Sequence, residues 1–194
     1  MSNACLAHVL AAIDAANSAD PKSEDGAPAA RLYGERMSAM LALFQPDAAE
    51  LVKIAARGQH IERWSLPRDA YPAGKAGYYA WRNAAKKMHA ERVGALMEKA
   101  GYSAEEIAAT QAMVRKDDLR ANADAQTVED VASLVFLKHY GVDFASGRTP
   151  EQLIDILVKT MRKMSPQAIA FAGRIGMPDA VAALAGEAAK KLGA

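Results

Sequence analysis

Alanine occupies 44 of the 194 positions, and this abundance narrows the possible folds more than any other feature of the chain. Alanine has the highest helix propensity of all residues and is depleted from β-strands. Hydrophobic residues make up 51% of the sequence, a share typical of a chain with a buried core. The composition therefore predicts a helical protein, and the length fits a single globular domain over residues 1–194.

Proline, glycine and capping residues divide the sequence into blocks of helix length. Ser103 followed by Glu106 is a capping box, and Thr149-Pro150 is typical of a helix start. No block alternates apolar and polar residues as a strand would, so the predicted fold class is all-α, with about eight or nine helices. The predicted helices cover residues 3–18, 28–44, 47–63, 78–100, 103–116, 127–140, 150–164, 166 onward and 178 onward, with an irregular stretch at 64–77.

Charge and cysteine content argue against several classes of protein. Lys and Arg number 24 against 23 Asp and Glu, so the net charge of +1 disfavours binding to nucleic acid. No apolar run approaches the roughly 20 residues that span a bilayer, and the first residues lack the basic leader of a secretory signal. Cys5, the single cysteine, can form no internal disulfide. These features predict a cytoplasmic protein without a membrane segment.

Two of the four histidines and a pair of carboxylates stand out as candidate metal ligands. His60 and His89 lie next to apolar residues, and Glu129 and Asp130 begin the most hydrophobic predicted helix. Helical bundles commonly bind metals with imidazoles and a carboxylate from separate helices. The alternative is structural: a histidine in a helix is often packed and hydrogen-bonded, and carboxylates are common in the first turn of a helix.

Cationic and aromatic residues gather in the irregular stretch and its flanks. Arg57, Arg63 and Arg68 could clamp a phosphate, which guanidinium groups bind in a bidentate manner. An aromatic ring nearby could then stack on the ligand. The alternative is an ordered loop in which these side chains pack on one another. The candidate substrate-binding residues are Arg57, Arg63, Trp64, Arg68, Tyr71, Trp81, Arg82 and Lys116.

Motifs along nearly the whole chain resemble the family catalogued as domain of unknown function 4202. They include Asp20-Pro21, Gln59-His60-Ile61-Glu62-Arg63-Trp64, Tyr71-Pro72, Trp81-Arg82, Glu129-Asp130-Val131 and Lys163-Met164-Ser165. This family has no settled activity, so the resemblance implies membership of a family but no particular reaction.

A second, more distant resemblance is to the HD superfamily of metal-dependent phosphohydrolases, which are all-α. The segment 89–96 is similar to the helix that supplies a metal-binding histidine there, and Asp130 falls at the place of the last metal-binding aspartate. The namesake His-Asp pair would align with Gln59-His60, and the first histidine with Tyr33. The resemblance implies an HD-domain-like fold whose remaining metal ligands are His60, His89 and Asp130.

Together these patterns predict a phosphohydrolase-like protein with a degenerate HD-type site and a small phosphorylated metabolite or nucleotide as substrate. A divalent metal of unspecified identity would lie on His60, His89 and Asp130. Glu129 would position a water or act as the general base, and the cationic residues would neutralise phosphate charge. The alternative is a non-catalytic helical module that binds an anionic ligand or a partner protein. In that case the cationic and aromatic residues matter and the histidines do not.

Overall fold

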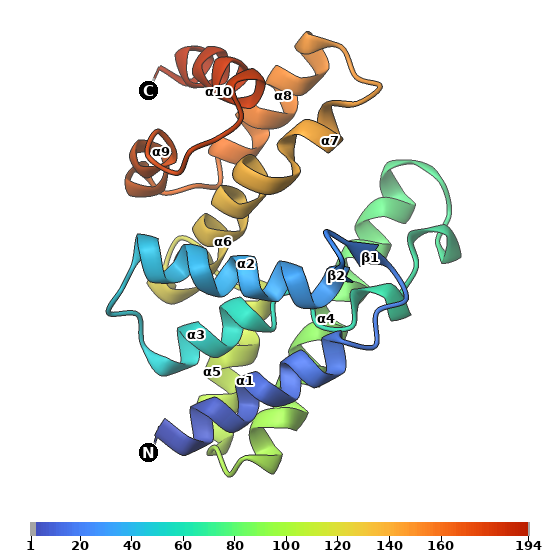
Figure 1. Cartoon of the computed structure of the whole chain (residues 1–194), viewed down its shortest axis with the longest axis vertical. Helices are drawn as coiled ribbons and strands as arrows, with labels where there is room; N and C mark the ends of the chain where they lie inside the picture. The colour runs from blue at the N-terminus through green and yellow to red at the C-terminus, as the bar shows by residue number, and fades with distance from the viewer. Residues whose placement is uncertain (1–2, 194) are drawn as a thin grey trace. The chain divides into compact units, whose positions relative to one another are not determined.

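The computed structural model describes residues 3–193 and divides the chain into two compact units. Unit 1 extends to Val128 and unit 2 begins at Glu129, so the division falls within α6 (Ala123–Val135; Figure 1). Over the described residues the structure has ten α-helices and one hairpin of two-residue strands, which confirms the predicted all-α class. None of these helices is both long enough and apolar enough to cross a bilayer. The single domain over 1–194 stays a prediction, and the units are described separately.

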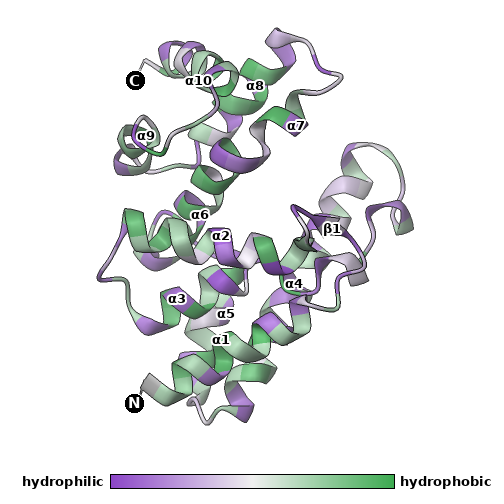
Figure 2. Ribbon diagram, viewed as in Figure 1, coloured by the Kyte–Doolittle hydropathy of each residue, from purple (hydrophilic) through white to green (hydrophobic). Residues whose placement is uncertain are grey.

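Unit 1 is built around α3, which packs against α1, α2 and α5, while α4 packs against α5 and α1. Its core contains fully buried apolar side chains, among them Ile13, Ile54 and Val93. The helices mix hydrophobic and hydrophilic residues along their length, as expected for helices that bury one face (Figure 2). The elements of unit 1 before α6 are α1 (Asn3–Asn17), β1 (Ser23–Glu24), β2 (Ala27–Pro28), α2 (Ala29–Phe44), α3 (Glu50–Arg57), α4 (Gly74–Lys99) and α5 (Ala104–Arg115).

The segment between α3 and α4 differs from the prediction at both of its ends. The third helix was expected to run to residue 63, but it ends at Arg57, and Glu62 adopts a left-handed backbone with φ of 50°. The Glu62 amide donates to the Asn17 side chain at 2.9 Å, which draws the chain toward α1 and out of the helical path. The next helix begins at Gly74, four residues earlier than expected. At Gly77 a side chain would collide with the Pro72 carbonyl oxygen, so only glycine lets the loop fold back on α4 here.

Unit 2 contains the end of α6 and four further helices, of which α8 and α10 pack side by side (Figure 1). The predicted helix at 127–140 was expected to close at Gly141. Instead α6 begins at Ala123, a π-helical turn covers Phe136–Tyr140, and Gly141 opens the next helix. A side chain at Gly141 would press on Val181, so this glycine permits close packing and does not cap a helix. The remaining elements are α7 (Gly141–Ala145), α8 (Pro150–Met161), α9 (Pro166–Ala172) and α10 (Asp179–Leu192).

The capping signals read from the sequence form as expected. The Ser103 hydroxyl accepts from the Glu106 amide at 3.3 Å, and the Glu106 carboxylate accepts from the Ser103 amide at 2.9 Å. Thr149 makes the same reciprocal pair with Gln152 at the start of α8. These bonds satisfy amide groups that have no partner within the first turn of a helix.

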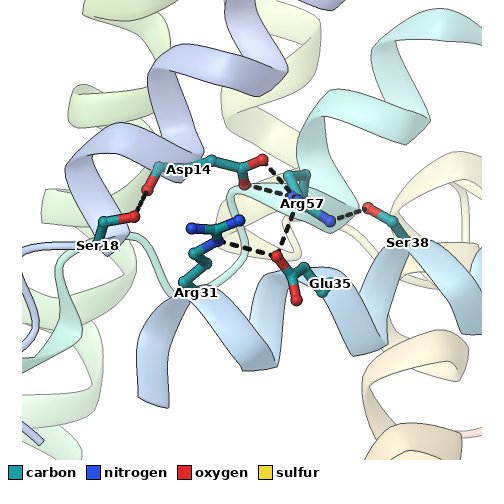
Figure 3. Close-up of polar contacts among 6 residues, drawn as sticks. All are labelled: Asp14, Ser18, Arg31, Glu35, Ser38 and Arg57. Carbon is teal, nitrogen blue, oxygen red and sulfur yellow. Dashed lines mark hydrogen bonds and ion pairs between the residues drawn. The ribbon is translucent and has the colours of Figure 1, made fainter. Parts of the chain in front are cut away.

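An ion pair joins α1 to the last turn of α3 (Figure 3). Arg57 donates from Nε and Nη2 to the two carboxylate oxygens of Asp14, each at 2.6 Å. Its Nη1 donates to the Ser38 hydroxyl of α2 at 3.3 Å, and Glu35 lies 3.9 Å from Nη2. The side chains of Arg57 and Asp14 are only 12% and 27% exposed, so little water competes for the pair. The guanidinium of Arg57 is thus held where three helices meet.

The variant Asp14→Asn is expected to lower the free energy of unfolding by about 2 kcal/mol, because a shielded charge-assisted pair is lost while the guanidinium stays half-buried. Urea unfolding followed by tryptophan fluorescence measures this in unit 1, where both tryptophans lie. The control Arg31→Gln removes the exposed pair with Glu35 on α2 and should change stability by less than about 0.5 kcal/mol. Equal losses in the two variants would contradict a special role for the Asp14–Arg57 pair.

Candidate functional site

Imidazole, guanidinium and aromatic side chains gather in unit 1 around the turn that follows α3. They come from α2, the turn itself, α4 and the residue that ends α5. The gathering unites two predicted metal ligands with four predicted substrate-binding residues. We call it the His60 cluster, and its members are Tyr33, His60, Arg63, Trp81, Arg82, His89 and Lys116.

His89 is the most deeply buried member, with 2% of its surface exposed. Its Nδ1 lies 2.7 Å from the Ile61 carbonyl oxygen, and because a carbonyl only accepts, Nδ1 carries the proton and donates it. Burial lowers the pKa of His89 to about 4, opposed by the bond to Ile61 and helped by the charge of Arg63, so the ring is neutral at neutral pH. Nε2 is therefore a buried acceptor, and within the described residues it has no hydrogen-bond partner. A ligand with a donor or a cation at this position would satisfy it.

His60 lies between His89 and Tyr33. Its ring stacks on Tyr33 with centroids 4.4 Å apart and planes 18° apart, and its centroid lies 5.7 Å from that of His89. Burial lowers the pKa of His60 well below its usual value, and Arg63, His89, Lys116 and Arg82 lower it further. The ionised groups that lower this pKa, Arg63, Lys116 and Arg82, are all cations. The electrostatic potential around this imidazole is positive.

Arg63 and Arg82 differ from Arg57 and Arg92, two other half-buried arginines of unit 1. Arg63 and Arg82 are half-buried too, yet within residues 3–193 neither forms an ion pair with a carboxylate. By contrast, Arg57 pairs with Asp14 and Arg92 with Glu62. The Arg63 guanidinium lies 4.7 Å from the centroid of the Trp81 ring, and burial lowers the pKa of Arg63, with Tyr33 and Tyr78 acting in the opposite direction. Two half-buried positive charges that lack a carboxylate partner among the described residues favour the binding of an anion.

Other predicted substrate-binding residues organise the loop before α4. Arg68 donates to the carbonyl oxygens of Tyr71 and Pro72 at 3.0 Å each, and the Trp81 indole donates to the Leu66 carbonyl at 2.9 Å. Trp64 and Tyr71 are half-buried in the same stretch. Arg57 is held by Asp14, outside the His60 cluster. The substrate-binding roles of these residues stay predictions.

Glu129 and Asp130, the predicted catalytic base and third metal ligand, belong to unit 2. Both are buried, and Asp130 accepts a hydrogen bond from the Ser165 amide at 2.8 Å, at the residue that caps α9. Glu129 lies 4.0 Å from the Lys163 ammonium. Within neither unit do three or more His, Cys, Asp or Glu side chains among the described residues converge as a metal site. The predicted ligand set takes members from both units and stays a prediction.

Two residues of unit 1 to which the sequence assigned no role make defined contacts in the structure. Asp14 interrupts the apolar stretch of the first helix, and a lone carboxylate there was a usable signal for a buried cationic partner. That the partner would be Arg57 followed only from the fold. Tyr33 was considered only as a replacement for a metal ligand, and in the structure its ring stacks on His60.

Acidification is expected to destabilise unit 1 through His89. The unfolded chain takes up a proton on this residue near pH 6.5, whereas the folded chain does so only near pH 4. The contribution of His89 to the free energy of unfolding is therefore fully present above pH 6.5. It is lost as the pH falls toward 4, and this loss amounts to about 3 kcal/mol. The variant His89→Asn retains a donor for Ile61 but cannot titrate, so its unfolding free energy should fall less over this range.

Urea unfolding at several pH values, again followed by tryptophan fluorescence, measures this difference. His8→Asn, a change at an exposed position of α1, should follow the wild type. If His89→Asn also followed the wild type, the proposed proton linkage would be refuted.

Comparison with known proteins identifies the family of the chain. The family model described as Domain of unknown function (DUF4202) matches residues 7–185, which is nearly the whole sequence. No curated protein and no solved structure matches the chain. The resemblance that the motifs indicated is confirmed for this family: the chain belongs to the family described as Domain of unknown function (DUF4202).

Proposed function

We propose that unit 1 binds a small phosphorylated molecule on the His60 cluster. The observation that carries this proposal is the pair of half-buried guanidinium groups, Arg63 and Arg82, which lack a carboxylate partner among the described residues. A phosphate would supply the missing negative charge, and guanidinium groups bind phosphate through paired, charge-assisted hydrogen bonds. Of the two functions predicted from the sequence, this proposal corresponds to the non-catalytic helical module that binds an anionic ligand.

The neutral imidazoles suit the same ligand. His89 presents an unpaired Nε2 acceptor, and a phosphate monoanion or a sugar carries hydroxyl groups that could donate to it. Unit 2 offers a less suitable site: its hollow between α7, α8 and α10 is lined by apolar residues such as Phe144, Leu157 and Val181. None of the described residues that line this hollow carries a charge. The ligand is therefore assigned to unit 1.

The variants Arg63→Gln and Arg82→Gln are each expected to weaken binding of phosphorylated probes at least tenfold, because a charge-assisted hydrogen bond contributes roughly 1.5–3 kcal/mol. Isothermal titration calorimetry with inorganic phosphate, ribose 5-phosphate and adenosine monophosphate provides the measurement. The control is Lys87→Gln, which removes a cation from an exposed position of α4. The proposal fails if none of the probes binds, or if the arginine variants bind as tightly as the control.

A second candidate is the metal-dependent phosphohydrolase with a degenerate HD-type site. The observation in its favour is the pair of neutral imidazoles, His60 and His89, one with an unpaired nitrogen. Neutral imidazole is the form that ligates metals, so the lowered pKa values fit that role. The other predicted residues, Asp130 as third ligand and Glu129 as general base, belong to unit 2, and their part in such a site stays a prediction. When bound, a divalent ion would polarise a phosphoryl oxygen or acidify a water.

The two candidates differ in how much the histidines matter. If the second is right, protein purified without a polyhistidine tag should contain about one equivalent of a divalent metal, and His89→Ala should remove it, because zinc-type sites depend on each ligand. Elemental analysis by mass spectrometry measures the metal. Arg82→Gln is the control and should retain it. A metal-free wild type whose phosphate affinity is unchanged by His89→Ala would overturn the hydrolase and leave the anion-binding module.

A further inference from the structure

Three residues of the His60 cluster and its surroundings lie along one face of α4. Tyr78, Arg82 and His89 are spaced by four and seven residues, and such spacings place side chains on the same side of a helix. Exposure falls along this row: Tyr78 is 43% exposed, Arg82 is half-buried and His89 is 2% exposed. The face therefore leads from an aromatic ring in solvent, past a cation, to a buried imidazole.

Tyr78 is also close to the second unpaired cation. Its ring centroid is 6.0 Å from that of Trp81, and the other neighbour of the Trp81 ring is the Arg63 guanidinium at 4.7 Å. Trp81 itself is already engaged, since its ring carries Arg63 and its indole nitrogen donates to Leu66. Of Tyr78 and Trp81, the two rings near these guanidinium groups, Tyr78 is the more exposed.

We infer that the ligand of unit 1 is a nucleotide, with its phosphate between Arg63 and Arg82 and its base stacked on Tyr78. One helical turn separates Tyr78 from Arg82, about 6 Å along the axis, and a ribose can bridge that distance. Base stacking on an aromatic side chain is sequence-tolerant, because every base has a π-face. This inference rests on the proposed function and adds the class of the ligand to it.

Tyr79 provides a matched control on the same helix. It is 49% exposed, similar to Tyr78, and its ring meets Tyr78 edge to face at 5.7 Å. Residue 79 points about 100° away from residue 78 around the helix, and its ring lies beside Lys75 at 6.0 Å. If any exposed aromatic ring on α4 could hold the base, substitution of either tyrosine would weaken nucleotide binding. If the base stacks on Tyr78, only substitution of Tyr78 would do so.

The test compares adenosine monophosphate with ribose 5-phosphate, which lacks the base, by isothermal titration calorimetry on the full chain. The wild type should bind the nucleotide at least tenfold more tightly. Tyr78→Leu should abolish that preference while leaving the affinity for ribose 5-phosphate unchanged. Tyr78→Phe, which keeps the ring, and Tyr79→Leu should both retain the preference.

Each failure has its own signature. If both probes bind the wild type equally well, or if Tyr79→Leu loses the preference as fully as Tyr78→Leu, the base-stacking inference is wrong while phosphate binding stands. If neither probe binds, the proposed function fails as well. Circular dichroism of each variant verifies that the helical structure is intact.

Discussion

The hydrogen bond from His89 to the Ile61 carbonyl is the interaction on which the candidate site depends. It joins the middle of α4 to the turn after α3, 28 residues earlier in the chain. The bond determines which ring nitrogen carries the proton, and it brings His89 beside His60. The same turn is held toward α1 by Asn17, which accepts from the Glu62 amide. Contacts from α1 and α4 thus hold the short irregular segment that follows α3, and that segment supplies His60 and Arg63 to the site.

The electrostatics of this region are unusual for a structural cluster. Two other half-buried arginines of unit 1 have carboxylate partners: Arg36 pairs with Glu24 and Asp25, and Arg57 with Asp14. Arg63 and Arg82 have none among the described residues, and their charges add to the burial that lowers the pKa of the neighbouring His60. An uncompensated half-buried charge costs stability, and such costs are commonly found at functional sites. The positive potential favours an anion and opposes a metal ion unless the ligand itself supplies negative charge.

Asp130, in unit 2, has a structural role in the protein itself. The Asp130 carboxylate accepts a hydrogen bond from the Ser165 amide. The Ser165 hydroxyl in turn caps α9 by accepting a hydrogen bond from the Ala168 amide. Asp130 therefore determines where the chain turns between α8 and α9. The sequence predicted a metal ligand at this position, which stays a prediction, and the structure shows that the carboxylate also serves a buried backbone amide that needs an acceptor.

Local interactions made much of the fold predictable from the sequence. The alanine content and the caps at Ser103 and Thr149 determined the helical class and several helix starts, because they act within one turn of the chain. The hairpin at 23–28 was missed because two-residue strands carry no periodic signal. Tertiary contacts alone decided the pairing of two half-buried arginines: Arg57 meets Asp14 across 43 residues, while Arg63, six positions later, meets no carboxylate in the described chain. Sequence spacing cannot distinguish them, because the carboxylate that meets Arg57 lies on another helix and is brought to it by helix packing.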